Sequence, residues 1–355
     1  MWGLEADAAQ PATAPAALPF REAARVIMSA THLLIAAGAG FSADSGLPVY
    51  DQIANEPAWK ERGVTYGDLC RPAMLTSDPG VAFGFWGTCF NKYRETRPHR
   101  GYSILRRWCA GKQGWYVYTS NVDGHFEDSG FDPERVLEIH GSLRRWLPRS
   151  AGAGGPVLLE HSHRFQVDET SRVLAAGLRS MEALNGDAEG TNLVDTTEAF
   201  RQAGVPVDSC GALMRPGVLM FDDEYAPLLA LLEHDQAKYQ KWEEEVEKEL
   251  ETSGATRLAI IELGCGTRVP AVRMESECVL KEASERAAAC AASGGAKVKD
   301  RVCLIRVNPD FPLNPRDPDR TISLQCSALT ALEAIEMEME KERITQNQIG
   351  GEITA

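Results

Sequence analysis

Apolar positions along the chain follow two patterns, short continuous runs and helical spacing. Continuous runs predict buried strands, at residues 32–37, 115–119, 136–139, 214–221, 258–263 and 302–307. Helical spacing predicts helices starting at Phe20, over 79–93, 100–109, 242–250 and 271–292, and in an acidic segment ending near 340. Strands alternating with helices predict an α/β fold, a Rossmann-like doubly wound parallel sheet covered on both faces. In such a sheet, ligands bind beyond the carboxyl ends of the strands.

A change of composition near Arg149 divides this pattern. Residues 149–205 are rich in Gly, Ala and Ser and predict a small inserted module, held by packing or partly mobile. The expected organisation is a disordered segment 1–18, a domain 19–340 and a flexible tail 341–355. Within the domain, we expect a Rossmann-like part at 19–148 and 222–340 and the module at 149–221.

The net charge limits the classes of partner. The 355 residues carry a formal charge of -14, which argues against nucleic acid and anionic membranes, because both require a basic surface. An acidic surface suits a cationic partner such as a lysine-rich peptide, although acidic solubility alone is a commoner explanation. The first twenty residues carry no Arg or Lys, so we expect no secretory or mitochondrial leader, and we also expect no membrane span, since no apolar stretch has the length needed. We expect a soluble, non-secreted protein in the cytoplasm, with the nucleus left open.

Cysteine spacing bears on metals and disulfides. The nine cysteines include no C-x-x-C pair. This odd number and wide spacing predict reduced intracellular thiols, without a disulfide framework. Structural zinc usually has paired ligands, so we expect no metal.

A glycine-rich turn follows the first predicted strand. Gly38, Gly40 and Ala43 satisfy G-x-G-x-x-G/A, a pattern whose backbone approaches a pyrophosphate and which predicts NAD binding. A plain strand-to-loop turn is the alternative. A dehydrogenase would also need an acidic residue about 20 positions further on, at the end of a second strand. Asp51 and Glu56 come too early, so hydride transfer is disfavoured.

Longer motifs carry a more specific resemblance. The stretch from Gly38 to Pro48, GAGFSADSGLP, resembles the G-A-G-x-S-x-x-S-G-I-P signature of the sirtuins, which are NAD-dependent lysine deacylases. Thr119–Asp123 (TSNVD) is similar to their T-Q-N-I-D motif, and His140–Ser142 to their H-G-S motif. Arg215–Phe221 resembles their R-P-x-V-V-x-F strand, Gly264–Gly266 stands at their G-T-S, and Val307-Asn308 resembles their I-N. These blocks follow the family order over residues 20 to 335.

The resemblance implies catalytic roles. His140 would be the general base acting on a ribose hydroxyl, a role suited to a group that titrates near neutrality. Asn121 would orient the nicotinamide ribose or a water through its amide. Asp123 would accept a hydrogen bond from the nicotinamide carboxamide. The structural alternatives are a histidine packed in the core, for His140, and a polar turn after a strand, for Asn121 and Asp123.

The resemblance also implies binding residues. The substrate would be an acyl-lysine protein or peptide, bound by β-augmentation along Val218, Leu219, Met220 and Phe221. An ordinary core strand is the alternative for these side chains. The NAD-binding set comprises Gly38, Ala39, Gly40, Ser42, Ala43, Pro48, Tyr50, Ser120, Asn121, Val122, Asp123, Gly264, Cys265, Gly266, Asn308 and Cys326.

Three positions depart from the family pattern. Asp51 stands where the family has an arginine near the phosphates, leaving Arg62 or Arg268 as substitutes. Ser120 replaces the glutamine of T-Q-N-I-D. Of the zinc cysteines only Cys210 is present, with Val207 at its partner's position; His161 and His163 are weak substitutes.

The leading hypothesis is an NAD-dependent protein-lysine deacylase that releases nicotinamide and O-acyl-ADP-ribose. Asp51 and Ser120 motivate two alternatives, an NAD glycohydrolase or ADP-ribosyltransferase of the same fold, and a catalytically weak NAD or ADP-ribose binding module. A hydride-transferring dehydrogenase is the least favoured of these hypotheses.

Overall fold

The computed structural model describes residues 19–49, 52–53, 56–149, 152–175, 193–291 and 300–353. The expectations for residues 1–18, Tyr50 and Asp51 therefore lie outside the described residues. The chain forms two compact units. Unit 1 comprises residues 1–36, 107–115 and 245–355, and unit 2 comprises residues 37–106 and 116–244.

Six strands form the larger sheet, in the order β3-β2-β1-β7-β8-β9. They are β1 (His32–Ala37), β2 (Gly114–Thr119), β3 (Val136–Glu138), β7 (Leu258–Leu263), β8 (Val302–Val307) and β9 (Thr321–Leu324). The pairs β2–β3, β7–β8 and β8–β9 are parallel. Every residue of β1, β7 and β8 is buried, as expected for strands covered on both faces. The Rossmann-like prediction is confirmed.

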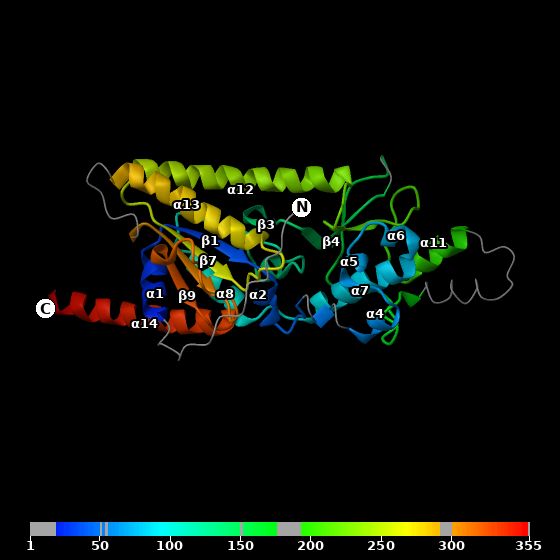
Figure 1. Ribbon diagram of the computed structural model, residues 1–355, viewed down its shortest axis with the longest axis horizontal. Coiled ribbons are helices and arrows are strands. Elements are labelled where there is room, and N and C mark those ends of the chain that lie inside the picture. The colour runs from blue at the N-terminus through cyan, green and yellow to red at the C-terminus, as the bar shows by residue number, and fades with distance from the viewer. Residues whose placement is uncertain are drawn as a thin grey trace. The chain divides into compact units, whose positions relative to one another are not determined.

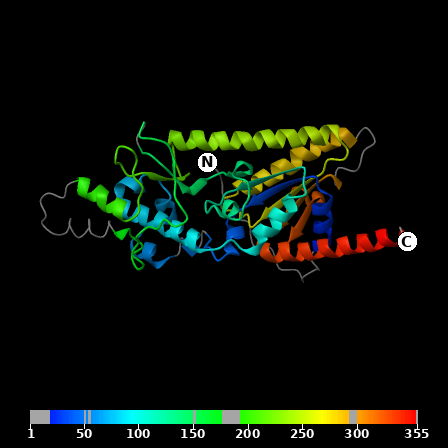
Figure 2. The same cartoon turned by 180° about the vertical axis from the view of Figure 1, so that it is seen from behind.

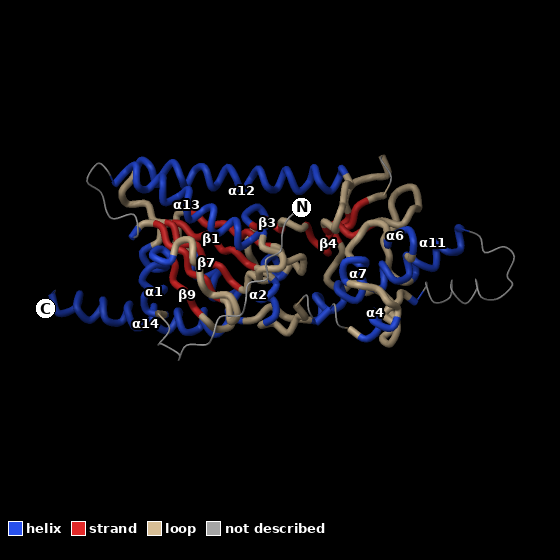
Figure 3. The backbone as a smooth tube through the Cα atoms, viewed as in Figure 1, coloured by secondary structure: helices blue, strands red, loops and turns tan. Residues whose placement is uncertain are grey.

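Helices cover the strands of unit 1 on both sides. Figure 1 and Figure 2 show α13 (Ala271–Ala291) on one side, and α1 (Phe20–Ser29) with α14 (Ala328–Ile353) on the other. In Figure 3 these helices flank a block of strands. α1 buries Ala23, Ala24 and Ile27. α14 continues past 340 to Ile353, so the predicted end of this helix was too early.

Unit 2 contains a smaller antiparallel sheet, β5-β4-β6. Its strands are β4 (Gly141–Leu147), β5 (Val157–Leu158) and β6 (Arg215–Val218). The helices that lie wholly in this unit are α2 (Ala39–Ala43), α4 (Pro57–Glu61), α5 (Tyr66–Leu69), α6 (Met74–Ser77), α7 (Pro79–Glu95), α9 (His125–Asp128), η1 (Pro133–Arg135) and α11 (Leu193–Gln202). The remaining elements are α8 (Arg100–Cys109), α12 (Ala226–Thr252) and η3 (Pro318–Arg320).

The module predicted at 149–221 shares its core with earlier residues. Phe83 of α7 stacks on Trp146 of β4, at a ring-centroid distance of 6.1 Å, and contacts Phe200 of α11 at 5.8 Å. Gly84 permits this closeness, because a Cβ there would lie 2.3 Å from the carbonyl oxygen of Arg172. Unit 2 consequently extends well beyond 149–221. The described part of the module is held by packing.

Candidate active site

The carboxyl ends of three strands are joined by hydrogen bonds. The Thr119 hydroxyl donates to the Ala37 carbonyl at 2.8 Å, and the Ile139 N–H donates to the Thr119 carbonyl at 2.9 Å. The Asn121 N–H in turn donates to the Thr119 hydroxyl at 3.1 Å. The residues that follow β1, β2 and β3 are thereby fixed close together, at the sheet edge where ligands of parallel sheets bind.

Ser42, Asn121 and Asp123 form a buried polar network, each less than a tenth exposed. The Ser42 hydroxyl donates to a carboxylate oxygen of Asp123 at 2.6 Å. The Asn121 amide donates to the Ser42 hydroxyl and to the Gly38 carbonyl, both at 3.0 Å. The second carboxylate oxygen of Asp123 accepts the His125 N–H at 2.8 Å. Ser42, Asn121 and Asp123, all predicted site residues, are therefore linked by hydrogen bonds to one another and, through Asn121, to Gly38.

Two further residues of this network carried no sequence motif. The Tyr102 hydroxyl lies 3.3 Å from the Ser42 hydroxyl, and its ring packs 4.4 Å from Phe41. Arg94 is buried and donates to the Asp123 carbonyl and, at 2.7 Å, to the carboxylate of Asp128. Arg94 comes directly after the helix predicted over 79–93, and that position in the sequence indicated no part in the site.

His140 lies between β3 and β4, partly buried. Burial lowers the pKa of its imidazole, and a hydrogen bond involving the Ser120 backbone offsets part of that shift. The His140 carbonyl accepts the Leu219 N–H at 2.8 Å. Gly141 (φ +76°) brings the strands together, since a Cβ there would lie 2.1 Å from the Gly217 carbonyl oxygen. The imidazole is neutral at pH 7 and can accept a proton.

Glu138, two residues before His140, was not among the predicted site residues. Burial raises the pKa of its carboxyl to about 8, and the nearby charges of Glu127 and Asp123 act in the same direction. Ser142 and Arg145 oppose the shift. At pH 7 this side chain mostly retains its proton.

The predicted substrate strand is an edge strand. Among the described strands β6 pairs with β4 alone, as an added peptide strand would require. Val218 and Met220 are buried, while Phe221 is 45% exposed. The N–H groups of Leu219, Met220 and Phe221 already donate to the His140 carbonyl, the Asp223 carboxylate and the Cys70 carbonyl. The main-chain donors of Leu219–Phe221 are therefore already used within the chain.

The other predicted NAD-binding residues of unit 2 surround the network. Gly38 and Val122 are buried or partly buried, and the Val122 carbonyl accepts the Leu143 N–H at 3.1 Å. Ala39 is exposed, and Gly40, Ala43, Pro48 and Ser120 are partly buried. The Ser120 N–H donates to the Ala37 carbonyl at 3.2 Å.

The predicted residues of unit 1 form a second group at the ends of β7, β8 and β9. The Gly264 N–H donates to the Val307 carbonyl at 3.0 Å, and the Asn308 amide donates to the Cys265 carbonyl at 2.9 Å. The N–H groups of Asn308 and Cys326 both donate to the Leu324 carbonyl, at 3.1 Å. Burial raises the pKa of the Cys265 thiol well above its usual range, so it is not a nucleophile at neutral pH. Gly266 is exposed.

The Asp208 carboxylate holds together the turn at which the resemblance would place zinc. Val207 pairs with Leu213, and Asp208 accepts the N–H groups of Cys210 and Ala212 at 2.9 and 3.0 Å. His163 contacts the Gly204 carbonyl at 2.8 Å and packs on Phe165. These residues serve turn formation and packing.

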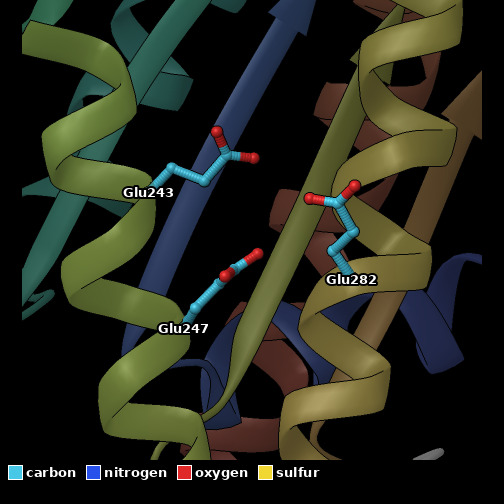
Figure 4. Close-up of side chains that lie close together, drawn as sticks. All are labelled: Glu243, Glu247 and Glu282. Atoms are coloured by element: carbon cyan, nitrogen blue, oxygen red, sulfur yellow. The ribbon is translucent and has the colours of Figure 1, made fainter. Parts of the chain in front are cut away.

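Among the described residues, one acidic group has a spacing that could hold a cation. Figure 4 shows Glu243, Glu247 and Glu282, with one carboxylate oxygen of each within 4.8 Å of the others. Arg286 lies 3.4 Å from Glu247 and supplies a positive charge, so an ion pair accounts for part of this cluster. No described helix is long and apolar enough to cross a membrane.

The fold and its buried polar network define a Rossmann-like protein with a candidate ligand site at the strand ends. The Sir2 family model matches residues 38–240, more than half of the chain, and the chain belongs to the Sir2 family. It is 30% identical over 146 residues to an NAD-dependent protein deacylase 2 of Pseudomonas aeruginosa, covering 41% of this chain and 57% of that protein. It is also 30% identical over 217 residues to a bovine mitochondrial NAD-dependent protein lipoamidase, sirtuin-4, covering 58% and 62%. The chain thus spans about three fifths of these relatives.

Solved structures show the same fold at low identity. A Sir2 homologue mutant in complex with ADP-ribose superposes with a TM-score of 0.52 at 18% identity, covering 91% of this chain and 97% of that one. A second Sir2 enzyme superposes with a TM-score of 0.51 at 17% identity, covering 91% and 98%.

Proposed function

We propose that this protein is an NAD-dependent protein-lysine deacylase that releases nicotinamide and O-acyl-ADP-ribose. The single observation that carries the proposal is the buried Ser42–Asn121–Asp123 network. Family membership and the deacylase names of the relatives support it.

The hydrogen-bond acceptors that this network leaves open fit NAD. Both amide hydrogens of Asn121 are used internally, so Asn121 would offer its carbonyl oxygen to a ribose hydroxyl or a water. The Asp123 carboxylate accepts two hydrogen bonds and has acceptor capacity for a carboxamide N–H. Ser42 donates to this carboxylate, and Arg94 donates to the main-chain carbonyl of the same residue, so both fix Asp123 in place. Bound NAD would supply the glycosidic bond between nicotinamide and ribose. Departure of nicotinamide would open the ribose carbon to an acyl-lysine oxygen.

His140 would act as the general base on a ribose hydroxyl. Its partial burial keeps the imidazole neutral at pH 7, which a base requires. The hydrogen bond from Leu219 to its carbonyl couples His140 to the segment that would receive the peptide. The base and the acyl-lysine would therefore be positioned by one backbone contact.

The hydrogen bonds that the predicted substrate strand already makes within the chain also favour a second candidate function, NAD cleavage without an acyl-lysine. Three N–H groups of the Leu219–Phe221 segment are already bonded within the chain. Fewer donors for a peptide strand would weaken substrate capture and leave water or another nucleophile to react. Ser120, shorter than the family's glutamine, leaves room for such a nucleophile.

One experiment separates the candidates. The wild-type protein and His140→Ala would be incubated with NAD, with and without acyl-lysine peptides, and the products identified by mass spectrometry. His161→Ala, an exposed histidine of the same unit, is the matched control. We expect O-acyl-ADP-ribose from wild type and His161→Ala, and a loss of about 10²–10⁴-fold in rate for His140→Ala.

The other product patterns would favour the other candidate functions. Free ADP-ribose without peptide would favour the glycohydrolase, and binding of NAD without turnover would favour a binding module. Unchanged turnover in His140→Ala would contradict its role as base.

A further inference from the structure

Two oppositely charged residues face each other in the middle of the parallel sheet of unit 1. Glu262 of β7 and Arg306 of β8 are register partners, and both side chains are completely buried. Their nearest oxygen and nitrogen atoms are 2.8 Å apart. Strands covered on both faces normally carry apolar residues throughout. Since apolar residues of similar volume are usually as stabilising as a buried ion pair, stability alone does not account for this one.

The pair belongs to a larger charged group that reaches the segment after β8. Besides Glu262, Arg306 contacts the Glu277 carboxylate at 2.9 Å and donates to the Leu313 carbonyl at 3.1 Å. Arg273 of α13 donates to the carbonyls of Phe311 and Leu313, at 2.9 and 2.8 Å. The Leu313 carbonyl thus accepts from two guanidinium groups, which fix it from two elements.

The same segment contains Asn308. Its side-chain oxygen accepts the N–H groups of Asp310 and Phe311, at 2.9 and 3.0 Å, and its amide donates to the Cys265 carbonyl. Asn308 therefore links the segment after β8 to the turn after β7. Neither Phe311 nor Leu313 is anchored by burial of its side chain, as they are 36% and 48% exposed. The main-chain contacts with the two arginines supply the anchoring that these side chains do not.

We propose that Glu262, Arg306 and Arg273 are positioning residues for NAD. They hold residues 308–313, and with them Asn308 and the Gly264–Gly266 turn, in the conformation that receives the dinucleotide. This inference rests on the proposed function for its ligand, and on the hydrogen bonds above for the positioning itself. None of the three residues contacts the ligand in this proposal, so their loss changes binding and leaves the chemical step intact.

The test uses variants that avoid an unpaired buried charge. In Glu262→Leu/Arg306→Leu both members of the buried pair are removed together, a replacement that often leaves protein stability unchanged or higher. Arg273→Met removes the other guanidinium. Arg316→Met is the matched control, because Arg316 contacts Glu277 at 3.2 Å but is 80% exposed and donates to no carbonyl of the segment in the described contacts. Steady-state kinetics with NAD and acyl peptide, and hydrogen exchange of the full chain without ligand, are measured on each.

For the double variant and for Arg273→Met we expect KM for NAD to rise about tenfold, with kcat and KM for the peptide within about twofold. We also expect faster exchange of the Asp310 and Phe311 amides. Arg316→Met should match the wild type in all of these. A purely structural role predicts equal losses in kcat and both KM values, or none.

Two results would overturn the inference at different points. Unchanged exchange at Asp310 and Phe311 in the double variant would show that the ion pair does not position the segment. Faster exchange with unchanged NAD affinity would show that the segment does not serve NAD. A wild-type protein that does not bind NAD at all would instead contradict the proposed function and the ligand assigned here, while the exchange result still decides the positioning.

Discussion

Two groups of strand ends in this protein are organised by different chemistry. At the ends of β1, β2 and β3, a single carboxylate accepts from one hydroxyl and one backbone N–H, and an amide donates to that hydroxyl. At the ends of β7 and β8, two arginines donate to backbone carbonyls, and two glutamates contact the guanidinium of one of them. Both groups are largely buried, so neither can rely on water to satisfy its polar atoms.

The contrast concerns what the loss of one partner leaves behind. Removing a neutral partner leaves an unmet hydrogen bond, which costs about 1–3 kcal/mol. Removing one member of a buried ion pair leaves an uncompensated charge, which costs more. The Asn121 group should therefore tolerate single changes better than the Arg306 group. Each prediction below tests that ranking.

The largest expected effect is in Arg306→Leu. This change leaves Glu262 buried without its ion-pair partner and should lower the free energy of unfolding by about 3–5 kcal/mol. Glu262→Leu/Arg306→Leu should recover most of that loss, because the completely buried pair is removed as a whole and Glu277, which remains, keeps its contacts with Arg273 and Arg316. Equilibrium unfolding in urea at pH 7.5 measures both. A double variant no more stable than the single one would show that packing, and not the charge, causes the loss.

Sequence reasoning found the strands of the two groups but not the ion pair. The runs Leu258–Leu263 and Val302–Val307 were predicted with the bounds that the structure has, because each begins with four consecutive apolar residues and ends with another. Register is a property of the folded sheet, so nothing local indicated that Glu262 would face Arg306. β4 was missed because two arginines interrupt its apolar pattern, and β9 because it has only four residues.

The site was predictable where it coincided with motifs. Gly38, Ser42, Asn121 and Asp123 come together as the resemblance implied, and the roles of these residues stay predictions. Tyr102 and Arg94 lie on helices whose spacing indicated helix formation only. Their part in the site depends on where α7 and α8 pack, which periodicity does not encode.

Ser42→Ala should have the second largest effect. It removes the hydroxyl that donates to Asp123 and accepts from Asn121, and should cost about 2–3 kcal/mol, because a hydrogen bond to a charged group is stronger than a neutral one. Ser29→Ala is the control, since that exposed hydroxyl makes one local bond to the Val26 carbonyl. Thermal and urea unfolding check both variants. A loss above that of Arg306→Leu would reverse the ranking.

A smaller effect should appear only at alkaline pH, in Glu138→Gln. Burial raises the pKa of Glu138 from 4.5 to about 8, so the folded state keeps a proton that the unfolded state releases. Its stabilising contribution is complete below pH 4.5 and is lost as the pH rises towards 8. The glutamine variant, always neutral, should match the wild type at pH 4.5 and exceed it by about 1–2 kcal/mol at pH 9, allowing for solvent screening at a partly buried carboxyl. An equal difference at both pH values would contradict the raised pKa.

The smallest expected effect is in Tyr102→Phe, which tests how far the Ser42–Asn121–Asp123 network extends. The tyrosine hydroxyl lies 3.3 Å from Ser42, longer than the 2.6 Å contact between Ser42 and Asp123, so it contributes less. Phenylalanine keeps the ring contacts with Phe41 and Phe126, at 4.4 and 5.0 Å. We expect a loss of about 0.5–1 kcal/mol and an unchanged KM for NAD. Tyr102→Leu, which also removes the ring packing, should cost several times more; equal losses in the two variants would place the contribution of Tyr102 in its hydroxyl and make it a full member of the network.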